Sequence, residues 1–235
     1  TDDRVAATNF NLDFIFKPGA TYSSISSSSF SIRYTPPGFL YDQKGAPVFS
    51  ESKENLLFSV ALLNSKVASR YLKILCPTLD FNSGSVVSIP VLNQDRVWGE
   101  LREKVNHLID LSKLDWDSFE FSWDFKLNPI VKVARHDGQK KIRTSIAEHA
   151  SDWRDKVLDA ANVEASINSE LAKAYNSLCI EDSTACTDEV TLLNNPKYRY
   201  GVSEEDHDKA PIQMSDITSE LVFYGIGCIM GRYSL

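Results

Sequence analysis

The chain has 235 residues, of which 43% are hydrophobic, so it can bury the core of one or two domains. Its formal net charge of −7 argues against a protein that coats nucleic acid through an overall positive charge. The charge is uneven, because residues 1–92 hold eight Lys and Arg against seven Asp and Glu, and residues 93–235 hold seventeen against twenty-five. One face of the first part can still contact DNA, since affinity depends on local neutralisation of phosphates.

The remaining composition predicts a plain intracellular protein. The four cysteines and four histidines are not spaced as zinc ligands, so we expect reduced thiols packed as small hydrophobic side chains and no metal site. There is no signal peptide, and no apolar run reaches the roughly 18 residues of a membrane helix, which predicts a cytoplasmic location and no membrane partner. The first residue is Thr1 and not methionine, which is compatible with processing, with removal of a tag or with excision from a longer protein.

Short strands are predicted at the start of the chain. Aromatic and β-branched residues alternate with polar ones near residues 14–16, 30–34 and 39–41, and Pro- and Gly-containing turns separate these runs. Asn55–Leu75 then carries apolar residues at steps of three and four, which predicts one amphipathic helix with Ser52 as its cap. A further strand is predicted at Ser85–Val91.

The second half reads as mainly helical. The periodicity predicts helices over residues 95–111 and 215–233, and over 139–178 either two helices or one long one. Residues 116–129 are aromatic and irregular and are expected to fold back against neighbouring elements, and 181–211 read as a polar, acidic loop. The expected fold class is α+β, with a small β-rich module and packed helix in residues 1–92 and a mainly helical region in 93–235.

Four stretches, in order along the chain, carry a resemblance to a known family. They are FSIRYTPPGFLYDQKGAPVF at 30–49, LLNSKVASRYLKILCPTLDFNSGSVVSIPVL at 62–92, DWDSFEFSWDFKLNP at 115–129 and YGIGCIMGRYSL at 224–235. Together they resemble the adenine-specific DNA methyltransferases of the BREX phage-defence system (PglX-type), and in particular their C-terminal target-recognition and helical region. The resemblance implies a bacterial protein whose role is to read DNA for a restriction-modification or antiviral defence system.

The same family implies where the chemistry lies. Its catalytic domain binds S-adenosylmethionine and methylates the N6 of a flipped adenine through an Asn/Asp-Pro-Pro-Tyr/Phe motif. The nearest candidates here, Asn128-Pro129-Ile130, Asn195-Pro196-Lys197 and Thr35-Pro36-Pro37-Gly38, all lack parts of that motif, and no glycine-rich cofactor loop follows a strand. We therefore expect no catalytic residue and no cofactor in this chain, with both belonging to the parent protein.

Double-stranded DNA is the expected partner, contacted by cations at phosphates and by polar side chains at base edges. The candidate residues lie in the predicted strands and turns, along the 55–75 helix and in a basic stretch before the long helix: Lys17, Ser24, Ser26, Arg33, Tyr34, Lys44, Lys66, Arg70, Arg135, Lys140, Lys141 and Arg143. Each set has a competing structural interpretation, namely a solvated Ser-rich loop, an Arg33 that holds a carboxylate beside a core Tyr34, a solvated helix flank and a solvated helix start.

Two hypotheses for the function follow. In the first, the chain is the target-recognition part of the methyltransferase and works with the catalytic domain of the parent chain. In the second, the acidic helical region is a protein-interaction scaffold that binds other subunits of the defence system and reads no sequence. A small self-contained enzyme has no supporting motif.

Overall fold

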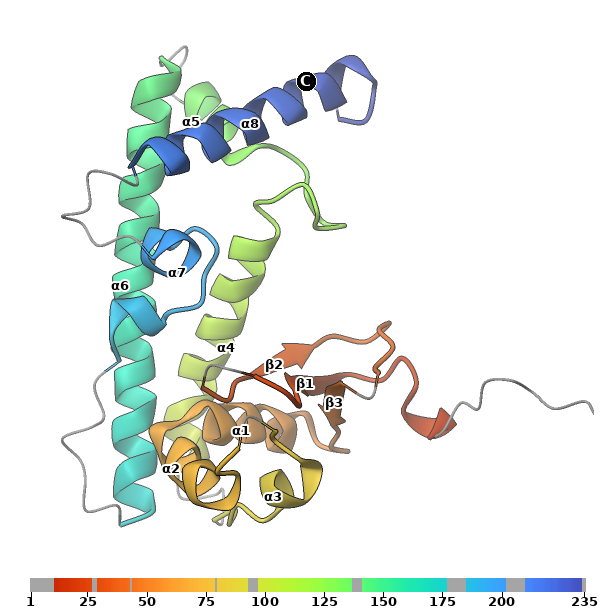
Figure 1. The fold of residues 1–235 in the computed structure, drawn as a ribbon. Helices are drawn as coiled ribbons and strands as arrows, with labels where there is room; N and C mark the ends of the chain where they lie inside the picture. Colours follow the sequence, from red (N-terminus) through yellow and green to blue (C-terminus); the bar gives the residue numbers. More distant parts are fainter. Residues whose placement is uncertain are drawn as a thin grey trace, which may run out of the picture. The chain divides into compact units, whose positions relative to one another are not determined.

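The computed structural model describes residues 11–26, 29–42, 44–78, 80–92, 97–136, 141–176, 185–201 and 210–233. It divides into two compact units, one formed by Thr1–Val105 with Ile167–Ser183 and the other by Asn106–Ser166 with Thr184–Leu235. Figure 1 shows the elements of both units in chain order. The fold class is α+β and mostly helical, as the sequence predicts.

The first unit contains an antiparallel sheet with the order β2-β1-β3, in which β1 is Gly19–Ser23, β2 is Ile32–Thr35 and β3 is Gly45–Val48. The helix α1 (Lys53–Asn64) packs against β1 and β2 (Figure 1). A strand at 30–34 was predicted and β2 confirms it.

The other two strands predicted from alternation, near residues 14–16 and 39–41, are wrong. Residues 12–14 form a 3₁₀ turn, η1 (Leu12–Phe14), closed by a bond from the amide of Phe14 to the carbonyl of Asn11 (2.9 Å). Residues 39–41 lie in the connection between β2 and β3 and form no strand. The central strand β1 begins at Gly19, where an added Cβ would lie 2.8 Å from the hydroxyl of Tyr41, so a close approach selects glycine.

The predicted helix at 55–75 is two helices, α1 and α2 (Lys66–Leu75), because Ser65 caps both. Its hydroxyl donates to the carbonyl of Leu62 (2.6 Å) and accepts from the amide of Ala68 (3.2 Å). The predicted cap at Ser52 is confirmed, since its Oγ accepts from the amide of Asn55.

The predicted strand at 85–91 is wrong, since residues 83–87 form a short helix, α3 (Ser83–Val87). Asn82 determines this outcome, because its side chain accepts from the amide of Ser85 at 2.9 Å and so starts a helical turn. The buried Val86 then serves as the apolar anchor of that turn. Two β-branched residues in sequence, Val86 and Val87, resemble a strand, but the Asn82 cap before them outweighs this pattern.

The first unit also contains the start of α4 (Trp98–Trp116) and the end of α6 (Ile142–Ala174), and side-chain amides and hydroxyls join these parts. Asn64 pairs with both backbone groups of Ile32, donating to the carbonyl (2.9 Å) and accepting from the amide (3.0 Å). Asn168 accepts from the amide of Lys66 (2.9 Å), and the hydroxyl of Tyr175 donates to the carbonyl of Pro90 (2.7 Å). The core of this unit includes Leu56, Phe58, Leu62, Leu72, Leu101 and Leu171.

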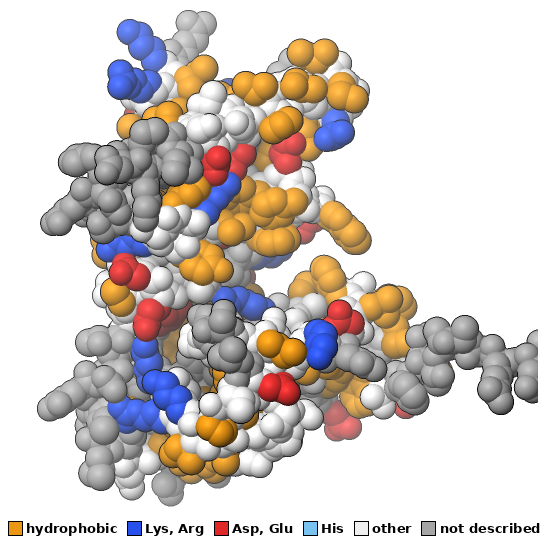
Figure 2. Space-filling model, viewed as in Figure 1, with side chains coloured by type: hydrophobic (Ala, Val, Ile, Leu, Met, Phe, Trp, Pro, Cys, Tyr) orange, Lys and Arg blue, Asp and Glu red, His pale blue; other side chains and the backbone are white. Residues whose placement is uncertain are grey.

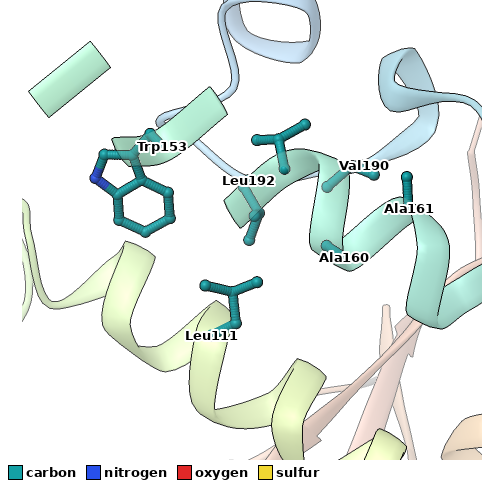
Figure 3. Packing of buried hydrophobic residues seen from close by; sticks show 7 residues of the cluster. Leu111, Trp153, Ala160, Ala161, Val190 and Leu192 are labelled. Atoms are coloured by element: carbon teal, nitrogen blue, oxygen red, sulfur yellow. The ribbon is translucent and has the colours of Figure 1, made fainter. Parts of the chain in front are cut away.

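The second unit is helical and contains α5 (Pro129–His136), α7 (Pro196–Tyr200) and α8 (Ala210–Ile229) with the remaining parts of α4 and α6. Of the two alternatives for 139–178, the structure has one continuous helix of 33 residues. Figure 3 shows its core, where side chains of α4, α6 and the segment 190–192 face one another. The members are Leu111, Trp153, Val157, Ala160, Ala161, Val190 and Leu192.

Within the stretch read as a loop at 181–211, the described residues 185–201 include Val190 and Leu192 of this core. It contains a 3₁₀ turn, η4 (Thr187–Glu189), followed by α7. The buried Asn195 donates to the carbonyls of Thr187 (2.7 Å) and Val190 (2.8 Å), and its Oδ1 caps α7.

The aromatic segment before α5 folds back as predicted. The ring of Phe125 is buried, 6.0 Å from the ring of Tyr224 on α8 and 5.3 Å from that of Tyr233. Aromatic packing of this kind holds α8 on the unit.

Candidate nucleic-acid interface

The sheet of the first unit has one buried and one open face. Ala20 pairs with Tyr34 and Val48, Tyr22 pairs with Ile32, and the side chains of Ala20, Tyr22 and Ile32 are buried. Residues directly opposite in an antiparallel pair lie on the same face, and neighbours along a strand lie on opposite faces. The other face is therefore the one available to a large ligand, except at Gly19, where the hydroxyl of Tyr41 and the ring of Phe49 lie 2.8 and 3.0 Å from the position of an added Cβ.

Arg33 lies on the open face. It pairs with Thr21 in the central strand, and Thr21 pairs on its other side with Pro47. The Arg33 side chain is exposed, whereas Tyr34, on the buried face, is half-buried. The two candidates that are adjacent in sequence thus lie on opposite faces of the sheet, and for each of them contact with DNA stays a prediction.

An Asx turn places Lys44 at the edge of this face. Oδ1 of Asp42 accepts from the amides of Lys44 and Gly45, both at 2.7 Å, and these two bonds hold the pKa of the Asp42 carboxyl below its ordinary value. The carbonyl of Lys44 in turn accepts from the amide of Ser24 (2.9 Å). Two candidates from separate turns, Ser24 and Lys44, are thereby held together, with the Lys44 side chain exposed.

An open groove of about 760 Å³ runs over this region. Three kinds of group line it: hydroxyls, one lysine beside one aspartate, and large apolar side chains. The lining is Thr21, Ser23, Ile25, Thr35, Phe39, Leu40, Tyr41, Asp42, Lys44 and Gly45. Such a surface can offer a cation to a phosphate, hydroxyls to polar edges and apolar contact to a planar ring.

Two further candidates flank β1. Lys17, just before the strand, is exposed, its ammonium lies 5.6 Å from the ring centroid of Phe14, and its carbonyl is 3.5 Å from the hydroxyl of Tyr41. Ser26 is half-buried beyond the other end of the strand. The first unit therefore brings Lys17, Ser24, Arg33 and Lys44 to one sheet and its turns.

The candidates on α2 do not line the groove. Lys66 and Arg70 are one turn apart and half-buried, on either side of the buried Val67 and Ala68. The position of Lys66 is determined by its amide bond to Asn168. Both remain candidates for contact with phosphates along a helix flank.

The basic stretch belongs to the second unit. Arg135 is exposed near the end of α5, and Lys141 and Arg143 are exposed at the start of α6. Lys140 lies outside the described residues. Because this stretch and the sheet belong to different units, each is a separate candidate surface.

Sequence reasoning missed the apolar part of the groove. Phe39 and Leu40 were read as strand residues, and only the Pro-Pro-Gly sequence before them marks a turn that could expose them. Across the described ranges, no group of three or more His, Cys, Asp and Glu could hold a metal ion. A search of the same ranges finds no helix with the length and apolar character needed to cross a membrane.

Comparison with known proteins places these features in context. No protein-family model matches the chain. The adenine-specific methyltransferase BrxX of Escherichia coli O9:H4 (strain HS) is 35% identical over 228 residues, 96% of this chain. The adenine-specific methyltransferase PglX of Lacticaseibacillus casei (strain Zhang) is 33% identical over 241 residues, 99% of this chain. The chain spans 18% of the length of each of these curated relatives. It therefore corresponds, along nearly its whole length, to one region of the BREX PglX-like adenine-specific methyltransferases.

Proposed function

We propose that this chain is the DNA target-recognition part of an S-adenosylmethionine-dependent N6-adenine DNA methyltransferase of a bacterial phage-defence system. Its catalytic domain, which binds the cofactor, lies in a part of the protein outside this chain. One observation carries the proposal: within a region homologous to adenine-specific methyltransferases, one sheet face is open, hydroxyl-rich and edged by Arg33 and Lys44.

The groups on this face have separate tasks in the proposed complex. Lys44 and Lys17 neutralise phosphates and hold the orientation of the duplex, and the guanidinium of Arg33 is suited to a bidentate contact with a base edge or a phosphate. The hydroxyls of Thr21 and Ser24 complete the polar contacts. The basic stretch of the second unit adds sequence-independent affinity, and the whole works in the cytoplasm beside the catalytic domain.

The test is a titration of short double-stranded DNA with the chain at several salt concentrations. Binding should weaken steeply with salt, and Arg33→Ala or Lys44→Ala should reduce the slope of log K against log[salt] by about 0.9 for each lost phosphate contact. Lys53→Ala is the matched control, since Lys53 is an exposed cation of the same unit that lies at the start of α1 and not on the sheet or its turns. No binding at low salt, or equal losses in all three variants, would contradict the proposal.

A scaffold is the second candidate, and the surface of α8 favours it. The sequence from Leu221 to Gly231 contains no charged residue. Figure 2 shows hydrophobic side chains gathered over α8, and Val222, Phe223, Ile226, Ile229 and Met230 are all exposed there. An apolar surface of this kind is typical of interaction sites. Purified subunits of the defence system that bind the chain while DNA does not would favour this candidate.

A further inference from the structure

The connection between β2 and β3 exposes two adjacent large apolar side chains. Phe39 is 46% exposed and Leu40 is 68% exposed, and both line the groove beside Lys44. Ile25, also exposed, lies in the same lining. Single exposed hydrophobic residues are common on protein surfaces, so exposure alone assigns no role. What distinguishes this pair is how the chain holds it and what surrounds it.

The connection is held on both sides of the pair. Before it, the amide of Gly38 donates to the carbonyl of Phe16 (2.9 Å), and Gly38 adopts a φ of +103°, a conformation that favours glycine. After it, the ring of Tyr41 packs edge-on against Phe49, with centroids 5.1 Å apart. Two prolines precede the glycine and limit the backbone further. The pair is thus presented on a preorganised loop, which lowers the entropic cost of inserting it into a ligand.

The charges around the pair fit a nucleic acid. Lys44 is exposed in the same groove, and Arg33 is exposed on the same face of the sheet. The one carboxylate of the lining, Asp42, is already bonded through Oδ1 to two backbone amides. Cations that reach phosphates and an apolar tip that reaches the stacked bases are the combination used by proteins that insert a wedge into a duplex.

We propose that Phe39 and Leu40 form an apolar wedge that enters bound double-stranded DNA at one base step and unstacks it. This inference rests on the proposed function, because it takes duplex DNA as the ligand of the groove. The wedge would make part of the recognition indirect, since the ease of opening a step depends on its sequence and is greatest at pyrimidine–purine steps. The preferred target would then contain such a step at a fixed place.

The experiment uses duplexes selected by the chain from a randomised pool, with 2-aminopurine substituted at successive positions. Binding should raise the fluorescence at one step, because unstacking relieves quenching. Phe39→Ala and Leu40→Ala should remove this rise and weaken binding by about tenfold each. The salt slope should stay unchanged, because neither side chain touches a phosphate. Phe223→Ala, an exposed apolar residue of the other unit, is the matched control and should leave all three readouts unchanged.

The outcomes separate the inference from the function on which it rests. If the chain binds duplex DNA through Arg33 and Lys44 but the fluorescence stays flat, the wedge is overturned and DNA recognition stands. If Phe39→Ala and Leu40→Ala bind as the unsubstituted chain does, the pair does not enter the duplex and the wedge is again overturned. If the unsubstituted chain binds no duplex at low salt, both proposals fail together.

Discussion

The two units use polar side chains in opposite ways. In the first unit the candidate cations Arg33 and Lys44 are exposed on one side of a sheet, and the exposed Asn64 at the end of α1 holds β2 through both backbone groups of Ile32. In the second unit the buried carboxylate of Asp115 accepts from the amides of Leu193 (2.7 Å) and Asn194 (2.9 Å).

The carboxylate of Asp115 therefore serves the fold of the second unit, whereas Arg33 and Lys44 lie on the surface of the first. Asp115 also accepts from the side-chain amide of Asn194 (2.9 Å), so both of its oxygens are hydrogen-bonded within the unit. Net charge counted along the sequence does not show how basic one local surface is. Substitutions that remove these hydrogen bonds in each unit test whether their effects on stability and on DNA binding differ between the units.

The largest loss of stability is expected from a substitution in the second unit. Asp115→Ala leaves the amides of Leu193 and Asn194 without their acceptor and should lower the free energy of unfolding by about 3 kcal/mol. Urea unfolding followed by the fluorescence of the buried Trp153 measures the change. Asp110→Ala, an exposed aspartate on the same helix, is the control and should change it by less than about 0.5 kcal/mol. A loss in Asp115→Ala as small as in the control would mean that the carboxylate is not structural.

A smaller loss of stability is expected when the bonds between Asn64 and Ile32 of the first unit are removed. Asn64→Ala removes both bonds to Ile32 and should lower the free energy of unfolding by about 1–2 kcal/mol. Because Arg33 follows Ile32 in β2, the same variant should also weaken binding to duplex DNA, which Asp115→Ala should not do. Urea unfolding and a DNA titration read the two effects, with Asn55→Ala of the same helix as control. An equal loss of DNA binding in Asn64→Ala and Asp115→Ala would break the distinction between the units.

The smallest expected change in stability depends on pH and arises from His149 in the second unit. Burial lowers the pKa of His149, although the hydrogen bond between its Nε2 and Oδ1 of Asn194 (3.1 Å) acts in the opposite direction. The unfolded chain then binds a proton more readily than the folded protein, so stability is full above the unfolded pKa of about 6.5 and falls as the pH drops toward the folded pKa. The slope contributed by His149 should not exceed about 1.4 kcal/mol per pH unit.

Urea unfolding at successive pH values measures this slope. His149→Gln should flatten the part of the curve below about pH 6.5. The control is His107→Gln, whose ring is exposed and lies 2.6 Å from Oδ2 of Asp159. If His149→Gln reproduces the unsubstituted curve, another group carries the dependence.

The sequence was most informative where one local rule dominated. Helical periodicity predicted α4, α6 and α8, and Ser52 was correctly identified as a cap. The family resemblance predicted the relationship to adenine-specific methyltransferases, and both relatives confirm it.

The failures came where a single side chain outweighed a pattern. Ser65 divides a continuous apolar stripe into two helices, and Asn82 turns a β-branched run into a helical turn. The apolar lining of the groove could not be predicted, because alternation does not tell whether Phe39 packs inward or stays exposed. That outcome depends on the bond between Gly38 and Phe16, which joins residues far apart in the sequence. The domain boundary expected after residue 92 stays a prediction.

The break between α1 and α2 at Ser65 also affects the orientation of α2 about its own axis. In one unbroken helix, the angular position of Lys66 and Arg70 would follow from the buried stripe of α1 at a fixed 100° for each residue. The break resets that angle, and the amide of Lys66 is instead fixed by Asn168, which lies more than a hundred residues further along the chain. The side of α2 that carries these two cations is therefore positioned from two places, by Ser65 at the end of α1 and by Asn168 near the end of α6.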